Sequence, residues 1–128
     1  MERALQIAFA IQFALFGLSH LLRPQPLIQF FIQLRSMGQA GIVFIALPTV
    51  ITGSLLVAFH NVWSGIPILL TVYGWAQLFK GTLYLFFPSY GLRQLARVTP
   101  ETTNWFRLPG IPFLVVAALL AWHLVYTA

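Results

Sequence analysis

The chain has 128 residues, of which 59% are hydrophobic and only 7% are charged. A soluble domain is about a quarter charged, and one of this length cannot bury so much apolar surface, so the composition excludes a soluble protein and predicts an integral membrane protein. The net charge of +5 is spread singly among apolar segments, which excludes a nucleic-acid-binding protein. Because cysteine is absent, disulfides, thiolate nucleophiles and cysteine-bound metals are excluded.

Four apolar stretches are long enough to cross a bilayer, which takes about 20 residues of helix. Together they predict one all-α domain over residues 1–128, an integral membrane four-helix bundle. The expected spans are 3–22, 39–60, 66–87 and 109–126.

Two longer connections are amphipathic. In residues 26–36 apolar side chains recur at i, i+3, i+4 and i+7, namely Leu27, Phe30, Phe31 and Leu34. This spacing predicts an interfacial helix that lies on the membrane with its apolar stripe toward the hydrocarbon. Residues 89–106 show a weaker amphipathic pattern, with Leu92 and Leu95 opposed to Arg93 and Arg97. Within this segment, Thr99 followed by Pro100 predicts the capped start of a short helix.

A shift of 64 residues aligns several landmarks of the two halves of the chain. The aligned pairs include Gly17 with Gly81, Pro24 with Pro88, and Pro48 with Pro112. One interpretation is a duplication whose halves are related by an axis along the membrane normal, a two-fold parallel repeat of helical hairpins. The other is that apolar sequences align with one another by chance, and both remain open.

Arginines fall mainly on one side of the expected spans. The connections after the first and third spans carry five of them, Arg23, Arg35, Arg93, Arg97 and Arg107, whereas the opposite side carries Arg3 alone. Under the positive-inside rule, both termini and the hairpin around residues 60–65 are expected outside. In a bacterial inner membrane this side is periplasmic.

Lys80 is the one charge well inside an expected span. It lies about 12 Å from the cytoplasmic end of its helix, where an ammonium costs about 2–3 kcal/mol. The functional interpretation is an anion or proton site, with Tyr73, Gln77 and Tyr84 on the same helical face and Gln12 at similar depth on the first span. The alternatives are a side chain that extends to the headgroups, or an acidic group of a partner subunit.

The histidines offer a further hypothesis. His60 and His123 are both expected near the outer face, where two facing imidazoles in a helical bundle are able to hold haem b. Histidine at an interface is also a common headgroup contact, so no cofactor is expected in the leading interpretation. With two acidic residues in the chain, catalysis has few groups to use, and we expect no enzyme.

The pattern of His60, Asn61 and Trp63, followed by Pro67, Thr71, Gly74, Trp75, Lys80, Gly81 and Pro88, resembles that of a family of small bacterial four-helix inner-membrane proteins. The resemblance covers about thirty residues and implies a bacterial origin and a shared motif at Lys80. It implies no activity, because none is established for that family.

Three functions follow as hypotheses. The leading one is a non-catalytic accessory or scaffolding subunit of a membrane complex, or a small homo-oligomer, with the lipid bilayer and other membrane subunits as partners. The second is a small channel or transporter with its site at Lys80. The third is a haem-binding electron-transfer protein.

Overall fold

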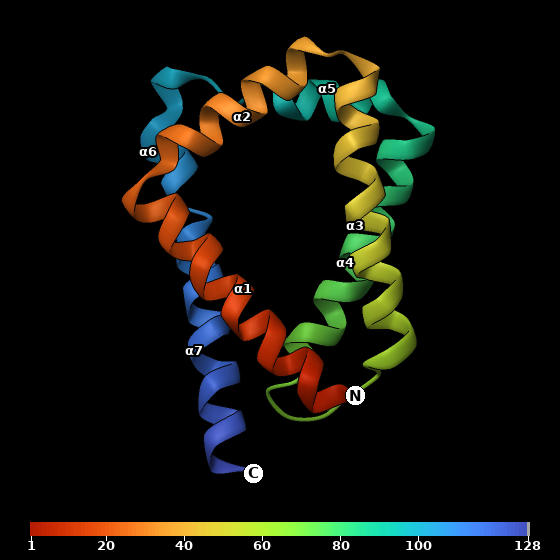
Figure 1. Ribbon diagram of the computed structural model, residues 1–128, viewed down its shortest axis with the longest axis vertical. Helices are drawn as coiled ribbons and strands as arrows, with labels where there is room; N and C mark the ends of the chain where they lie inside the picture. The colour runs from red at the N-terminus through yellow and green to blue at the C-terminus, as the bar shows by residue number, and fades with distance from the viewer. Residues whose placement is uncertain (128) are drawn as a thin grey trace.

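The computed structural model describes residues 1–127, which are helical in most of their length and contain no strand within that range (Figure 1). The expectation of an all-α fold is confirmed. The long helices are α1 (Glu2–Leu22), α3 (Gln39–Phe59), α4 (Ile68–Phe86) and α7 (Gly110–Tyr126). The short ones that connect them are α2 (Pro24–Ser36), α5 (Pro88–Leu95), the 3-10 helix η1 (Pro100–Thr102) and α6 (Thr103–Arg107).

Three helical stretches are long and apolar enough to cross a membrane: Glu2–Leu22, Gln39–Phe59 and Pro100–Tyr126, of which the last joins η1, α6 and α7. Helix α4 has a comparable length of 19 residues but a lower mean hydropathy. The difference has a clear source, since α4 carries the polar side chains of the candidate site, Tyr73, Gln77, Lys80 and Tyr84.

Prolines separate the long helices from the connecting segments at equivalent places. Arg23 leaves the helical conformation at φ −141° and ψ 71°, directly before Pro24. Phe87 does the same at φ −132° and ψ 69°, directly before Pro88. A residue before proline is pushed toward the extended region, so each helix ends there. Helix α2 thus begins at Pro24, two residues earlier than the segment expected from the sequence.

The segment after α4 is divided into α5, η1 and α6. The start of η1 is capped as expected, because the Thr99 amide donates to Thr102 Oγ1 over 3.1 Å and Pro100 occupies the first position. Arg35 of α2 donates to the carbonyls of Leu95, Ala96 and Val98 at 3.3–3.4 Å. A guanidinium at the end of a helix stabilises the last free carbonyls, so Arg35 ties α2 to the end of α5.

The long helices form two pairs, α1 with α7 and α3 with α4 (Figure 1). Glycines allow both close approaches. A Cβ on Gly17 would lie 2.6 Å from Leu114 Cγ, and a Cβ on Gly81 would lie 2.5 Å from Val50 Cγ2. In the second pair Gly53 lies directly against the backbone of α4. Small residues of this kind let helices approach closely in membranes.

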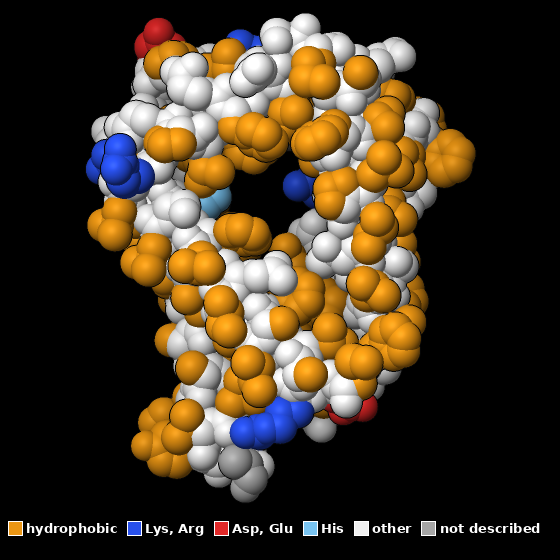
Figure 2. Space-filling model, in the orientation of Figure 1, with side chains coloured by type: hydrophobic (Ala, Val, Ile, Leu, Met, Phe, Trp, Pro, Cys, Tyr) orange, Lys and Arg blue, Asp and Glu red, His pale blue; other side chains and the backbone are white. Residues whose placement is uncertain are grey.

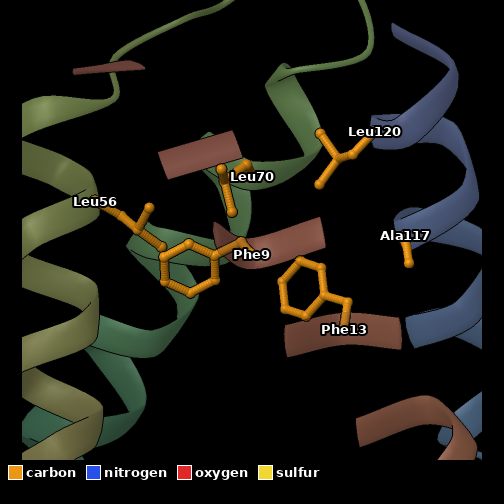
Figure 3. Packing of buried hydrophobic residues seen from close by; sticks show 6 residues of the cluster. All are labelled: Phe9, Phe13, Leu56, Leu70, Ala117 and Leu120. Carbon is orange, nitrogen blue, oxygen red and sulfur yellow. The ribbon is translucent and has the colours of Figure 1, made fainter. Parts of the chain in front are cut away.

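The pairs are joined at both ends of the molecule. At the end that holds the two termini (Figure 1), a cluster from α1, α3, α4 and α7 joins them. This terminal cluster consists of Phe9, Phe13, Leu56, Leu70, Ala117 and Leu120 (Figure 3). At the opposite end, α2 and α5 run across the helix pairs (Figure 1), and a second cluster packs α2 and α5 onto α3 and α4. Its buried members are Leu34, Ile42, Ala46, Tyr84 and Leu95.

An opening passes through the molecule between the two junctions (Figure 2). It runs across the helix pairs rather than along them, and protein closes it at both ends of the long axis. Its edge is mainly apolar, and atoms coloured as Lys or Arg and as His are visible there (Figure 2).

Candidate functional site

One face of α4 points toward α1. The Tyr73 ring makes edge-on contacts with Phe9 and Phe13 of α1, with ring centres 6.2 and 4.8 Å apart. Lys80 and Tyr84 follow Tyr73 by seven and eleven residues, spacings that return to the same face of a helix. Because α4 is a continuous helix over all three positions, the spacing groups Tyr73, Lys80 and Tyr84 on one face.

Lys80 lies on this face without an acidic neighbour. Its Nζ is 5.5 Å from the centre of the Tyr84 ring, a cation–π distance. Its side chain is exposed, whereas Tyr84 is buried and packs edge-on against Tyr90, with ring centres 6.0 Å apart. Within residues 1–127 the ammonium makes no hydrogen bond, so Lys80 has donors to offer to a ligand.

The two glutamines predicted for the site differ in position. Gln77 is half-buried on α4, between Tyr73 and Lys80 in the chain. Gln12 is exposed on α1 and makes no hydrogen bond to any described residue. Gln77 thus lies on the stretch of α4 that carries the site, and Gln12 makes no hydrogen bond to Lys80.

His20 belongs to the opposite side of the molecule, where α1 meets α6 and α7. Its Nδ1 lies 3.1 Å from the Phe106 carbonyl oxygen, to which it donates. The ring packs against Phe106 and Phe113, with ring centres 4.7 and 6.0 Å apart. The orientation of the His20 ring is thus fixed by this hydrogen bond and by aromatic packing.

His60 forms a buried polar cluster that joins three helices. Its Nδ1 lies 3.0 Å from Thr71 Oγ1 of α4, and its Nε2 lies 3.0 Å from Gln6 Nε2 of α1. Because the Thr71 hydroxyl donates to the Val62 carbonyl over 2.7 Å, it accepts from Nδ1–H, which leaves Nε2 to accept from the Gln6 amide. His60 follows the last residue of α3, and burial lowers its pKa. The arrangement fits a neutral imidazole.

This cluster explains two polar residues that sequence reasoning missed. Gln6 and Thr71 lie in expected spans, and both are buried. Each is a polar side chain within an apolar stretch, which could have drawn attention to it, but no local sequence pattern indicates that both contact His60. The cluster uses both ring nitrogens of His60, and its partners are Gln6 and Thr71 rather than His123, which is half-buried on α7.

An apolar cavity of about 390 Å³ lies between α4 and α7, with Phe13 of α1 on its wall. Tyr73 lines it from the same face of α4 that carries Lys80. Cavities of roughly 300–1,000 Å³ are typical of small-molecule sites. The lining includes Leu69, Val72, Pro112, Phe113 and Val116.

Arg107 is a second cation with an unused donor. Its Nε is buried and has no hydrogen-bond partner in the described part of the chain. It ends α6, on the side of the molecule opposite α4, so it is separate from the Lys80 face. A group of three or more side chains suited to a metal ion is absent from residues 1–127.

No family model matches the chain, and the searches of curated proteins and of solved structures also found no match. Geometry and chemistry therefore carry the functional argument.

Proposed function

We propose that the chain is a non-catalytic integral membrane protein, an accessory or scaffolding component that crosses the bilayer four times. The observation that carries this proposal is the exterior of the four long helices. Large apolar side chains are exposed along each of them, for example Ile11, Phe44, Phe79 and Val125, which are 57, 58, 68 and 68% exposed. Such a surface requires lipid or protein around it.

The arrangement supports crossing by α4 as well. Helix α4 packs along α3, and the hairpin between them lies at the same end as both termini (Figure 1). If α3 crosses, α4 has to return beside it. The helices α2 and α5 then lie at the cytoplasmic face, together with the arginines that follow α1 and α4, as the positive-inside rule requires.

The contacts between helices also support the proposed two-fold repeat. Gly17 faces Leu114, and Gly81 faces Val50. Gly17 precedes Gly81 by 64 residues, and Leu114 follows Val50 by 64 residues, which is the shift that aligns the two halves of the sequence. The pair α1–α7 thus corresponds to the pair α4–α3, so each pair combines the first helix of one half with the last helix of the other.

Purification in a mild detergent, followed by mass spectrometry of everything that remains bound, tests the accessory role. We expect defined additional subunits, or a homo-oligomer of fixed size. A monomer that retains no other protein after purification from its own membrane would contradict the proposal.

A small transporter is the second candidate, because Lys80 makes no hydrogen bond within residues 1–127 and the two helix pairs resemble the halves that rock against each other in transporters. Both ends of the opening are closed in this conformation, so transport requires one junction to separate. Reconstituted vesicles that show saturable anion flux, abolished by Lys80→Met, would favour this candidate over the accessory role.

A further inference from the structure

The opening between the helix pairs has to be filled in a membrane, and its shape limits what fills it. The terminal cluster closes one end of the long axis, and α2 and α5 close the other (Figures 1 and 2). A spanning helix of another protein is about 10–12 Å across and would have to pass through both closed ends. A flexible chain that enters from the side meets neither obstacle.

The apolar cavity beside the opening suits such a chain. Its 390 Å³ lie between α4 and α7 and are lined by apolar and aromatic side chains, among them Phe13, Tyr73, Phe113 and Val116. An alkyl chain placed there gains apolar contact on several sides. An apolar cavity alone accepts many hydrophobic molecules, so the chemical class of the ligand depends on the nearest polar group of the protein.

Lys80 supplies that polar group. It follows Tyr73 by seven residues on the same helical face, about 10 Å along α4 toward the proposed cytoplasmic side. The two acidic residues of the chain, Glu2 and Glu101, are exposed and belong to α1 and η1 rather than to α4. A cation at this depth is stabilised by an anion that comes with the ligand.

We propose that the opening binds a single-chain amphiphile with a carboxylate head. The tail occupies the cavity between α4 and α7, and the carboxylate accepts hydrogen bonds from Lys80, with Gln77 and Tyr84 as neighbouring donors. The inference rests on the membrane insertion proposed above and names the ligand of that protein.

The depth of Lys80 favours a small head over a phospholipid. Lys80 precedes Phe86, the last residue of α4, by six residues, which places it about 9 Å inside the helix end. A carboxylate on one chain reaches this depth beneath α2 and α5. A two-chain phospholipid has to bring a larger headgroup to the same depth and leaves its second chain outside the cavity.

A photoreactive fatty acid, with a diazirine in its chain, tests the proposal on the full protein in uncharged detergent. We expect one probe per chain and adducts on the cavity-lining residues of α4 and α7. Lys80→Met should reduce labelling about tenfold or more, because a charge-assisted hydrogen bond is lost, whereas Lys80→Arg should retain most of it. Arg93→Met removes an arginine of α5, outside the site, and should label as the wild type does.

Filling the cavity provides an independent test of the tail. Val116 lines the cavity, whereas Val115 next to it is 51% exposed on the outside of α7. Val116→Trp should abolish labelling, and the matched control Val115→Trp should leave it intact. Thermal unfolding of each variant shows that it is folded.

Three results would overturn the proposal. One is equal labelling by an alcohol analogue of the probe, which would remove the role of the carboxylate. Another is undiminished labelling of folded Lys80→Met, and the third is full competition by a two-chain anionic phospholipid. If the probe does not label the protein but other subunits still copurify with it, the ligand proposal is refuted and the accessory role stands.

Discussion

The contact between α3 and α4 at Gly53 gives a sharp test of the helix pairs. A Cβ on Gly53 would lie 2.4 Å from Leu78 N and 2.8 Å from Leu78 Cα. Ordinary contact begins at 3.4 Å, so Gly53→Ala requires the two helices to separate by about 1 Å at this point. Both atoms belong to the backbone of α4, so no side-chain rotation relieves the overlap.

The expected cost follows from the kind of atom that has to move. Overpacking of a well-packed contact costs about 1–3 kcal/mol, and a backbone contact belongs in the upper part of that range. Gly81→Ala meets Val50 Cγ2 at 2.5 Å and the Val50 backbone N at 3.0 Å, so a side chain can absorb part of the overlap. We therefore expect Gly53→Ala to lower the free energy of unfolding more than Gly81→Ala.

Unfolding by a denaturing detergent, followed by tryptophan fluorescence, measures both changes. Ser54→Ala is the matched control, because Ser54 follows Gly53, is exposed and loses one local hydrogen bond to the Ile51 carbonyl. It should stay within about 0.5 kcal/mol of the wild type. A Gly53→Ala protein as stable as that control would refute the close approach of α3 and α4.

Three further predictions concern other parts of the molecule. Because burial lowers the pKa of His60, folding favours the neutral imidazole. The contribution of His60 to thermal stability should therefore be complete above the unfolded pKa near 6.5 and fall as the pH drops toward the folded pKa. His60→Gln should flatten this pH profile, whereas the control His123→Gln should leave it unchanged. Gly38 has φ +67°, so Gly38→Ala should lower the free energy of unfolding by about 1–3 kcal/mol, although the added Cβ would meet no atom within 4 Å. A variant that unfolds at the wild-type temperature would contradict this backbone conformation. A C-terminal alkaline phosphatase fusion should be active and a green fluorescent protein fusion dark; the reverse would invert the proposed topology.

Local patterns in the sequence predicted the elements well, because each depends on nearby residues. The prolines at 24 and 88 end the helices before them, and Thr99 caps the short helix that follows it. The face that carries Tyr73, Lys80 and Tyr84 depends only on helical periodicity.

The partners of each helix were not predictable in the same way. The sequence predicted a bundle of four helices but not that they would form two pairs with an opening between them. Gln6, His60 and Thr71 meet because α1, α3 and α4 converge at one end, and no local spacing encodes that meeting. The haem hypothesis required His60 and His123 to face each other, whereas His60 contacts Gln6 and Thr71.

The pairing of α1 with α7 has a consequence for biosynthesis. Helix α1 is made before α7, so the face of α1 at Gly17 stays uncovered until α7 has been made. The α3–α4 hairpin, by contrast, assembles as soon as its few loop residues emerge. A chain that stops before Gly110 leaves α1 without its partner, and this half-finished protein exposes a surface that chaperones and membrane proteases are able to recognise.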